Sequence, residues 1–349
     1  MSQTVQITAP RHVEVIDQPS PELRAGQVRV CTTFSGISAG TELTAYRGSN
    51  PYLNKAWDPD LRMFTDGIGG LSYPVAGLGY SEVGHVVEVA PDLAGDPTVP
   101  PVGANVWGIW GHRAEAVLPA EKLRGCTVPV GLDPIAATFA RVGAVALNAV
   151  LAADVHLGET VAVFGQGVLG LLATRLVRLS GGTVVAVDAV PGRLQKALEY
   201  GADTVLDARD GTSGQQIRKL TDGRGADVAI EISGSYPALH EAIRSAAVGA
   251  RVVAAGFYQG DGAGLSLGDE FHHNRVNLIC SQIGGVPAAV AGRWDQFRLN
   301  QTFLRLAADH QIDPAGLVSH VVPVSDAADA YRMLDQSPHE ALQVVLTFP

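Results

Sequence analysis

Cysteine is scarce in this sequence, and the cysteines present form no pattern. Cys31, Cys126 and Cys280 are scattered along 349 residues. Neither a disulfide framework nor a metal site built from closely spaced cysteines is indicated. We expect all three to be reduced residues of the core or of loops.

Long hydrophobic runs and clusters of basic residues are missing too. No apolar run reaches the roughly 18 residues that a membrane-spanning helix needs, and the start of the chain lacks the basic and apolar regions of a signal peptide. The formal net charge is −10, without a basic cluster that would bind a phosphate backbone. We therefore expect a cytoplasmic protein that acts on a small molecule, with neither nucleic acid nor membrane as a partner.

Glycine, in contrast, is abundant. The chain contains 40 glycines, and 46% of its residues are hydrophobic while 17% are charged. This composition is typical of a folded α/β enzyme with many tight turns. The length allows two domains, because a domain usually contains about 100–200 residues.

One glycine-rich stretch indicates a nucleotide-binding turn. The apolar run Val161–Phe164 predicts a buried strand, and Gly165, Gly167 and Gly170 follow it with the spacing G-x-G-x-x-G. In such a turn the first glycine permits the sharp bend and the second lets a pyrophosphate approach the backbone. The third lets the next helix pack closely on the strand. The spacing is a weak signal alone, but its context strengthens it.

The helix after these glycines offers the anion site. An apolar helical pattern runs over residues 171–180. Val168 and Leu169 lie in the glycine-rich turn before this helix and are expected to contact the cofactor, and a diphosphate would bind the free amide groups at the positive end of the helix.

An acidic residue after the next strand indicates which cofactor binds. Thr183–Asp188 predicts a second apolar strand, and Asp188 lies about 20 residues after the glycine motif, where a carboxylate binds the ribose hydroxyls of an adenosine. This carboxylate would repel a ribose phosphate, which favours NAD over NADP. Arg193 keeps NADP open as an alternative cofactor. An alternative role for Asp188 is to cap the helix that follows it.

The chain changes character along its length. Up to about residue 130, short alternating segments between Gly, Pro and Asp predict a β-rich domain. Within it, residues 47–70 show no clear periodicity, which predicts a long functional loop. Residues 133–153 have helical spacing and bridge to the next domain.

Beyond the glycine motif, strand and helix patterns alternate as far as about residue 285. This alternation predicts a parallel sheet covered on both faces. The remaining tail is too short to form its own domain, so we expect it to return to the first one. The predicted domains are residues 1–142 with 289–349, and residues 143–288.

This order resembles the medium-chain dehydrogenase/reductase superfamily over essentially the whole chain. Phe34–Glu42 resembles the family segment Gly-Ile-Cys-x-Thr-Asp, Gly79–Val89 resembles its Gly-His-Glu segment, and Gly111–Ala120 resembles the strands that close the first domain. The resemblance implies an α/β protein with a Rossmann dinucleotide-binding domain and a β-rich, GroES-like catalytic domain.

Within the superfamily, the sequence is most similar to the branch that includes D-guloside 3-dehydrogenase. This similarity lies in residues 40–64, 266–274 and 293–294 and in the last strand, residues 342–348. A weaker similarity to bacteriochlorophyllide hydroxyethyl dehydrogenases lies in residues 36–42 and 79–80. Both groups imply hydride transfer at a carbinol carbon with a nicotinamide cofactor.

Further cofactor-binding residues are expected at the ends of later strands. The pairs Ser233-Gly234 and Ala255-Gly256 end successive strands at the sheet edge where this fold binds its ligand. The resemblance places Ser281 and Ile283 beside the nicotinamide carboxamide. It also implies a homodimer or homotetramer that joins sheets through residues 276–281.

The departures from the family concern zinc. Zinc-dependent members have a Cys, a His with a Glu, and a second Cys around the catalytic metal. This sequence has Ser38 or Ala39, Tyr80 with Ser81, and about Arg141 in those places. Such groups do not make the nitrogen and sulfur ligand set that zinc prefers, and the four cysteines of the structural zinc lobe are missing. We expect no bound metal.

Without zinc, a side chain must take the proton of the alcohol. Tyr80 is our first choice, with an ordinary pKa near 10 that a cation such as Arg141 would lower; alternatively it only fills the volume of the lost metal. Thr41 stands where the family has a hydroxyl proton relay. His112 and Glu42 are further candidates. A histidine in a Gly-His-Arg turn is more often a surface or packing residue, and an acid at the position of Glu42 more often braces the loop.

The sequence therefore predicts an NAD-dependent, zinc-independent oxidoreductase that interconverts a secondary alcohol and a ketone. A sugar, glycoside or cyclitol is the expected substrate, for which the polar loop residues Asp58, Asp60, Arg62 and Asp66 would supply hydrogen bonds. One alternative is a zinc-free quinone or enoyl reductase using NADPH, against which Asp188 argues. Another is a non-catalytic NAD-binding sensor.

Overall fold

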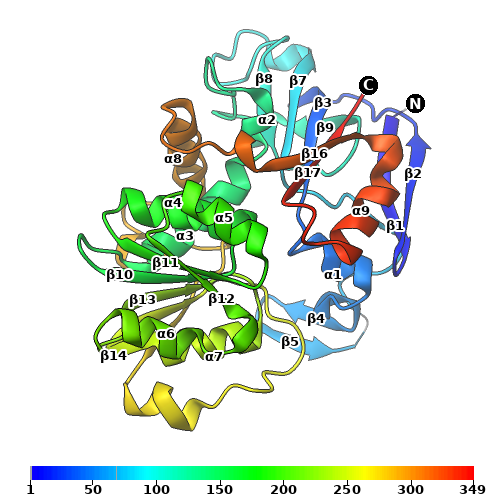
Figure 1. Ribbon diagram of the computed structural model, residues 1–349. Helices are drawn as coiled ribbons and strands as arrows, with labels where there is room; N and C mark the ends of the chain where they lie inside the picture. The colour runs from blue at the N-terminus through cyan, green and yellow to red at the C-terminus, as the bar shows by residue number, and fades with distance from the viewer. Residues whose placement is uncertain (1, 68) are drawn as a thin grey trace. The chain divides into compact units, whose positions relative to one another are not determined.

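The computed structural model describes residues 2–67 and 69–349; Ile68, within the expected long loop, lies outside the described residues. The chain forms two compact units (Figure 1). Unit 1 contains the residues up to Arg141 and from Ala307 onward, and unit 2 is Val142–Leu306. We predicted that the chain would return to the first domain at residue 289, but unit 2 extends to Leu306. The reason is that α8 (Gln296–Ala308) packs on α3 (Ala140–Ala153): a Cβ on Gly143 would lie 2.2 Å from the ring of Phe303.

Unit 1 is built on a mixed sheet that both ends of the chain complete. The order is β16-β17-β3-β7-β8, and β9 also pairs with β3. The C-terminal strand β17 runs antiparallel to β3, with Val344 opposite Ile37, so the C-terminal tail returns to this unit as expected. The strands are β3 (Gln27–Ile37), β7 (Glu82–Val89), β8 (Asn105–Gly108), β9 (Glu115–Pro119), β16 (Val318–Pro323) and β17 (Gln343–Thr347).

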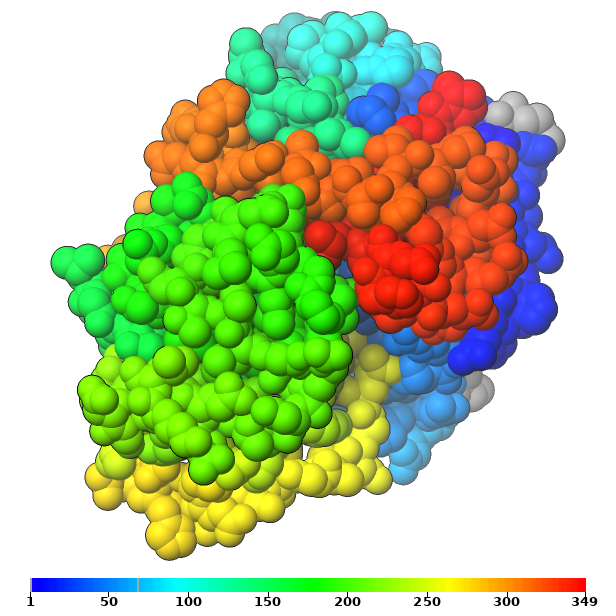
Figure 2. All heavy atoms as spheres, viewed as in Figure 1, coloured from blue at the N-terminus to red at the C-terminus, as the bar shows by residue number. Residues whose placement is uncertain are grey.

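A smaller sheet, in the order β2-β1-β6, accompanies it. Between the sheets lies a core that includes Ile7, Ile37 and Tyr331, each at most 2% exposed. The helix α9 packs against β2 at the surface of unit 1, where Figure 2 shows red atoms beside blue ones. The elements are β1 (Ser2–Ala9), β2 (His12–Gln18), β6 (Val75–Ala76), α1 (Glu42–Arg47), α2 (Pro134–Ala137) and α9 (Ala327–Gln336).

The expectation of an irregular loop over residues 47–70 is wrong in part. A hairpin of β4 (Lys55–Asp58) and β5 (Met63–Asp66) forms there. Trp57 stands opposite Phe64 with ring centroids 5.2 Å apart, and such cross-strand aromatic pairs stabilise a hairpin. The Asp58 carboxylate closes the turn by accepting from the backbone N–H of Asp60 and of Leu61.

Unit 2 is the predicted parallel sheet with helices on both faces. Its order is β12-β11-β10-β13-β14-β15, and every neighbouring pair is parallel. Because both faces are covered, Val161–Phe164 is at most 1% exposed. The helices α4 and α5 lie on one face and α6 and α7 on the other (Figure 1). Among the described residues, no helix combines the length and the apolar character needed to cross a membrane.

The strands of unit 2 are β10 (Thr160–Phe164), β11 (Thr183–Asp188), β12 (Thr204–Asp207), β13 (Ala226–Glu231), β14 (Ala246–Ala254) and β15 (Asn277–Cys280). Its other helices are α4 (Val168–Leu179), α5 (Pro191–Glu199), α6 (Ser213–Leu220) and α7 (Tyr236–Ser245).

Candidate functional site

The glycine turn of unit 2 has the geometry that its spacing predicts. Gly165 has φ +91°, and a Cβ there would lie 2.7 Å from the Cβ of Ser233. A Cβ on Gly170 would lie 1.7 Å from the carbonyl oxygen of Gly165, so the helix can approach the strand only with glycine there. A Cβ on Gly167 would meet nothing within 4 Å. This open space is what an approaching phosphate needs.

The first turn of α4 offers amide groups to an anion. The helix begins at Val168, its N-cap is Gly167, and no side chain caps it. The first N–H groups of a helix have no partner within it. The amides around Val168 and Leu169 therefore stand where an anion binds favourably.

Asp188 is tied to the glycine turn. It ends β11 and is only 8% exposed. One carboxylate oxygen accepts from the backbone N–H of Gln166 at 2.6 Å, and the other from the N–H of Val190 at 2.8 Å. The N-cap of α5 is Val190, so Asp188 is not the helix cap. A carboxylate has about four acceptor positions, so two remain for a ligand. Arg193 lies half-buried in the first turn of α5.

A buried acid holds the next two strand ends together. Glu231 ends β13 and accepts from the backbone N–H groups of Ser233 and Gly234 and from the hydroxyl of Tyr258. Burial raises the pKa of its carboxyl group. A Cβ on Gly256, which follows Ala255 at the end of β14, would lie 2.2 Å from the nitrogen of Gly234.

Neither Glu231 nor Tyr258 was predicted from the sequence as a residue of the site. For Glu231, the sequence offered one signal, which is an acid at the end of a mostly apolar strand.

The segment after β15 is held by a buried amide. The side-chain nitrogen of Asn148 donates to the carbonyl of Gly285 at 3.1 Å and lies 3.4 Å from the hydroxyl of Ser281. These residues line a hollow of about 330 Å³ in unit 2. Ser281 is 6% exposed, and Ile283 is half-buried. Asn148 is a further residue that the sequence did not single out.

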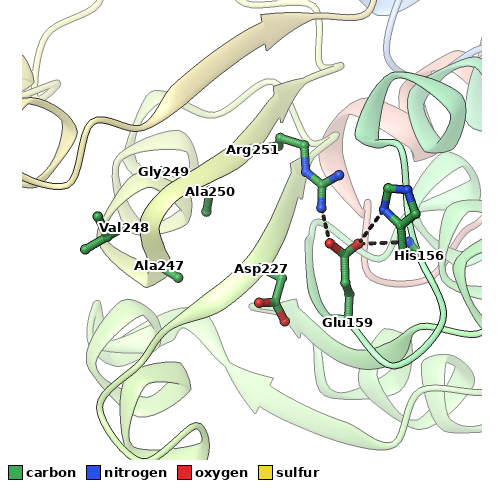
Figure 3. Close-up of a pocket in the computed structure, with 8 residues that line it drawn as sticks. All are labelled: His156, Glu159, Asp227, Ala247, Val248, Gly249, Ala250 and Arg251. Carbon is green, nitrogen blue, oxygen red and sulfur yellow. Dashed lines mark hydrogen bonds and ion pairs between the residues drawn. The ribbon is translucent and has the colours of Figure 1, made fainter.

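A second hollow of unit 2 belongs to the opposite edge of the sheet. It measures about 350 Å³, and its lining residues precede β10 or begin β13 and β14. Figure 3 shows Glu159 between Arg251 and His156, with both contacts dashed. The glycine turn and Asp188 follow the carboxyl ends of the strands, so this hollow is not part of the nucleotide cradle.

In unit 1, Tyr80 lies among hydroxyl groups and near a cation. Its phenol shares a hydrogen bond with the hydroxyl of Ser38, and the nearby hydroxyl of Thr41 also favours the phenolate. Thr41 is exposed at the start of α1. The guanidinium of Arg141 interacts electrostatically with the phenol. Ser38, Tyr80 and Arg141, which stand at the zinc positions of the family that the chain resembles, are therefore gathered in one place with Thr41.

The charge of Arg141 favours the phenolate of Tyr80, as expected, but it does not decide the direction in which the pKa of Tyr80 moves. Burial disfavours the phenolate and raises the pKa of Tyr80 above its ordinary value. The hydrogen bonds from Ser38 and Thr41 and the charge of Arg141 oppose this rise, and Glu42 adds to it. Tyr80 is consequently a neutral phenol at neutral pH, and its ionisation belongs to alkaline pH.

Replacing Arg141 with methionine is expected to raise the pKa of Tyr80 further. Methionine keeps an unbranched side chain but removes the positive charge that favours the phenolate. The measurement is the phenolate absorbance during an alkaline titration, taken as the difference between Arg141→Met and the same variant with Tyr80→Phe. A titration unchanged or moved to lower pH would contradict this assignment.

Direct contact of Glu42 and His112 with a ligand is not supported. Both side chains are 1% exposed, and His112 Nε2 lies 2.7 Å from a carboxylate oxygen of Glu42. The reason is that α1 and the segment before β9 turn these two groups into the core of unit 1. Their neighbours Ser35, Glu82 and Tyr331 are fully buried as well, and none of these three was singled out from the sequence.

The residues at the family's zinc positions do not fit a zinc ion. Tyr80 and Ser38 bond to each other through neutral hydroxyl groups, and Arg141 brings a positive charge to the same place. Zinc prefers thiolate, imidazole and carboxylate ligands. In the described part of the chain, no three His, Cys, Asp or Glu side chains gather in a way that would hold a metal ion.

Comparison with known families gives a match that lies within unit 2. A family model described as zinc-binding dehydrogenase matches residues 168–297. This range contains Asp188 and the strand ends of the cradle, but none of Ser38, Tyr80 and Arg141.

Whole-chain relatives exist among characterised proteins. D-guloside 3-dehydrogenase of Shigella flexneri is 29% identical over 351 residues, which cover 98% of each chain. Sorbitol dehydrogenase of Halalkalibacterium halodurans is 25% identical over 369 residues, with 96% of each chain covered. The structure of 2R,3R-butanediol dehydrogenase from Bacillus subtilis superposes with a TM-score of 0.80 at 20% identity, covering 100% of both chains.

Proposed function

This chain belongs to the medium-chain dehydrogenase/reductase superfamily and is an oxidoreductase that acts on a CH–OH group, and from that premise we propose a more specific function. The protein oxidises a secondary alcohol to a ketone, or performs the reverse reaction, with NAD and without zinc. The single observation that carries the proposal is the pairing of Tyr80 with Ser38 where zinc-dependent relatives bind their metal.

NAD is favoured because of Asp188. Its carboxylate is fixed by Gln166 and Val190, with acceptor positions left for two ribose hydroxyls. A ribose phosphate would bring negative charge against this carboxylate. The amides at the start of α4 would bind the diphosphate, and the turns at Ser233 and Ala255 and the segment from Ser281 to Ile283 would hold the nicotinamide end.

The proton transfer is assigned to Tyr80. The bound cofactor supplies a ring that accepts or returns a hydride. In the oxidation, the alcohol O–H proton passes to the Tyr80 phenolate while the C–H bond gives its hydride, and the carbinol becomes a ketone. In the reduction, the neutral phenol donates its proton to the forming alkoxide. Ser38 and Thr41 stabilise the phenolate, and exposed Thr41 connects it to solvent.

Because the Tyr80 pKa is raised, the phenol is protonated at neutral pH and is ready to act as an acid there. Oxidation requires the phenolate. Its rate should therefore increase with pH as Tyr80 ionises, and ketone reduction should fall over the same range.

The substrate class is a polyhydroxylated compound. Full-length relatives are named for a guloside and for sorbitol. On the β4–β5 hairpin, Asp60, Arg62 and Asp66 carry exposed charged side chains suited to hydrogen bonds with hydroxyl groups. Asp58 is less available, because its carboxylate closes the hairpin turn.

The test is a panel of glycosides, free sugars, cyclitols and simple secondary alcohols, each offered with NAD and with NADP while reduced-cofactor absorbance is followed. Turnover of a polyhydroxylated compound with NAD is expected. A preference for NADP would contradict the cofactor assignment. Cofactor binding without turnover of any compound, or of its ketone, would instead identify a sensor.

We also propose a cytoplasmic homodimer or homotetramer joined through β15. This strand ends the sheet of unit 2, and its residues Asn277, Leu278 and Cys280 are exposed. An edge strand with an exposed leucine favours pairing with a second strand.

A further inference from the structure

A chain of hydrogen bonds that includes three ionisable groups runs through the core of unit 1. His112 Nε2 contacts Glu42 at 2.7 Å, and His112 Nδ1 contacts the hydroxyl of Ser35 at 2.5 Å. Ser35 in turn donates to Glu82 at 3.1 Å. All four side chains are at most 1% exposed. The mechanism above uses none of these four groups, although burying such charges is costly unless they are paired.

The contacts determine where the protons are. The hydroxyl of Ser35 has one proton and donates it to Glu82, so the short contact with His112 requires a proton on Nδ1. Glu42 accepts from the hydroxyl of Tyr331 and from the backbone N–H of Ser38. Its remaining contact, with Nε2, is then also an accepted hydrogen bond.

With hydrogen bonds from Nδ1 to Ser35 and from Nε2 to Glu42, His112 has the contacts of an imidazolium. The raised pKa of His112 agrees, since the attraction of Glu42 and Glu82 outweighs burial and the charge of Arg113. Glu82 accepts from Ser35 and from the backbone N–H groups of Ser81 and Trp110. Burial raises the pKa of Glu82, and the charge of His112 and the two backbone hydrogen bonds oppose this rise. Glu42 has three contacts of its own, with the hydroxyl of Tyr331, the backbone N–H of Ser38 and Nε2 of His112.

One end of this chain reaches the Tyr80 site. The second carboxylate oxygen of Glu42 accepts from the backbone N–H of Ser38 at 2.8 Å, and the N–H of Glu42 donates back to the carbonyl of Ser38 at 2.9 Å. These two bonds close the turn from Ser38 to Glu42 at both ends. The hydroxyl of Ser38 bonds to Tyr80, so the place of that hydroxyl depends on Glu42.

We propose that Glu42 is a positioning residue for proton transfer: held in the core by the imidazolium of His112, it fixes the turn that presents the Ser38 hydroxyl to Tyr80. Glu82 acts through Ser35 and His112 by keeping the imidazole protonated. This inference rests on the role proposed for Tyr80, but its test needs no substrate.

The test reads the ionisation of Tyr80 directly, as phenolate absorbance with the matching Tyr80→Phe protein subtracted. The charged and polar groups that face the phenol are Ser38, Thr41, Glu42 and Arg141. Ser38→Ala removes a hydrogen bond to the phenolate and should raise the Tyr80 pKa by about one unit, since such a bond contributes about 1.5 kcal/mol.

The decisive comparison repeats Ser38→Ala in a Glu42→Ala background. If Glu42 positions Ser38, the Ser38 hydroxyl is already misplaced in the Glu42→Ala protein. Ser38→Ala should then shift the Tyr80 pKa by less than about 0.3 units, which is close to the error with which the effects of independent mutations add. A shift of about one unit in both backgrounds would overturn the proposal.

Glu42→Gln provides a second variant should Glu42→Ala fail to fold. Glutamine keeps a carbonyl that can accept from Ser38 but loses the charge. The Ser38→Ala shift should persist, and the Tyr80 pKa should fall below that of the unmodified protein, because the charge of Glu42 disfavours the phenolate. An unchanged or higher pKa would contradict the proposal.

The matched control is Asp335→Asn. The side chain of Asp335 in unit 1 is 8% exposed and pairs with Arg11 and Arg47. Among the described residues, these ion pairs do not involve Ser38. In this background the Ser38→Ala shift should keep its full size, even if the variant is less stable. Loss of the shift here would mean that general destabilisation of unit 1, and not Glu42, controls the Tyr80 site.

Discussion

Replacing Tyr80 with phenylalanine is expected to lower kcat for alcohol oxidation by about 10²- to 10⁴-fold, the usual contribution of a positioned acid or base. The ring keeps its volume, so the packing of unit 1 should be retained. Only the hydroxyl that bonds to Ser38 is lost. The measurement is steady-state oxidation of the best substrate with NAD, over a range of pH.

The pH profile separates chemistry from packing. In the unmodified protein the oxidation rate should rise at alkaline pH, because the Tyr80 pKa lies above its ordinary value. In Tyr80→Phe this rise should disappear, while the affinity for NAD stays the same. A variant with nearly full activity and an unchanged pH profile would show that Tyr80 only fills space.

Replacing Asp188 with alanine is expected to lower kcat/KM for NAD by about 10²- to 10⁴-fold. Two hydrogen bonds from ribose hydroxyls to a carboxylate contribute about 1.5–3 kcal/mol each, and 1.4 kcal/mol corresponds to a factor of ten. Removing the charge also removes the repulsion of a ribose phosphate. The ratio of activity with NADP to activity with NAD should therefore increase, as steady-state kinetics with each cofactor would show.

Two further variants separate ribose binding from support of the turn. Asp188→Asn keeps one acceptor for the backbone N–H of Gln166 or Val190 and should lose less NAD affinity than the alanine variant. Asp207 stands beside Asp188 in the register of the neighbouring strand, and its side chain is paired with Arg209. Asp207→Asn should leave the kinetics with both cofactors unchanged. Equal losses at both positions would contradict the assignment.

The nucleotide cradle is predictable from the sequence because its determinants are local. Gly165, Gly167 and Gly170 lie within six residues, and the constraint on each concerns its own backbone. Asp188 ends the next strand, and parallel strands bring their carboxyl ends to one edge of the sheet. The structure adds that Asp188 bonds to the glycine turn itself.

The buried charged group of unit 1 was not predictable in the same way. Glu42, Glu82 and His112 come from separate segments, and Tyr331 comes from the C-terminal tail. No spacing rule relates these positions, because only the packed sheets and helices bring them together. The same packing decides the direction of the Tyr80 pKa, since burial outweighs the charge of Arg141.

The β4–β5 hairpin formed where the sequence predicted an irregular loop. Its segment has few apolar residues in alternation, so the pattern of a strand is weak. The cross-strand pair Trp57 and Phe64 and the turn closed by Asp58 form it instead. Such side-chain pairing depends on register, which the sequence alone did not reveal.

We propose that this dehydrogenase uses Tyr80 where zinc-dependent members of the superfamily use their metal. The most direct test is to dialyse the purified protein against a strong chelator, measure its zinc content, and then follow NADH formation with the best polyhydroxylated substrate of the panel. We predict full activity with zinc far below one ion per chain. Stoichiometric zinc whose removal abolishes the activity, and whose return restores it, would show that the metal and not Tyr80 performs the chemistry.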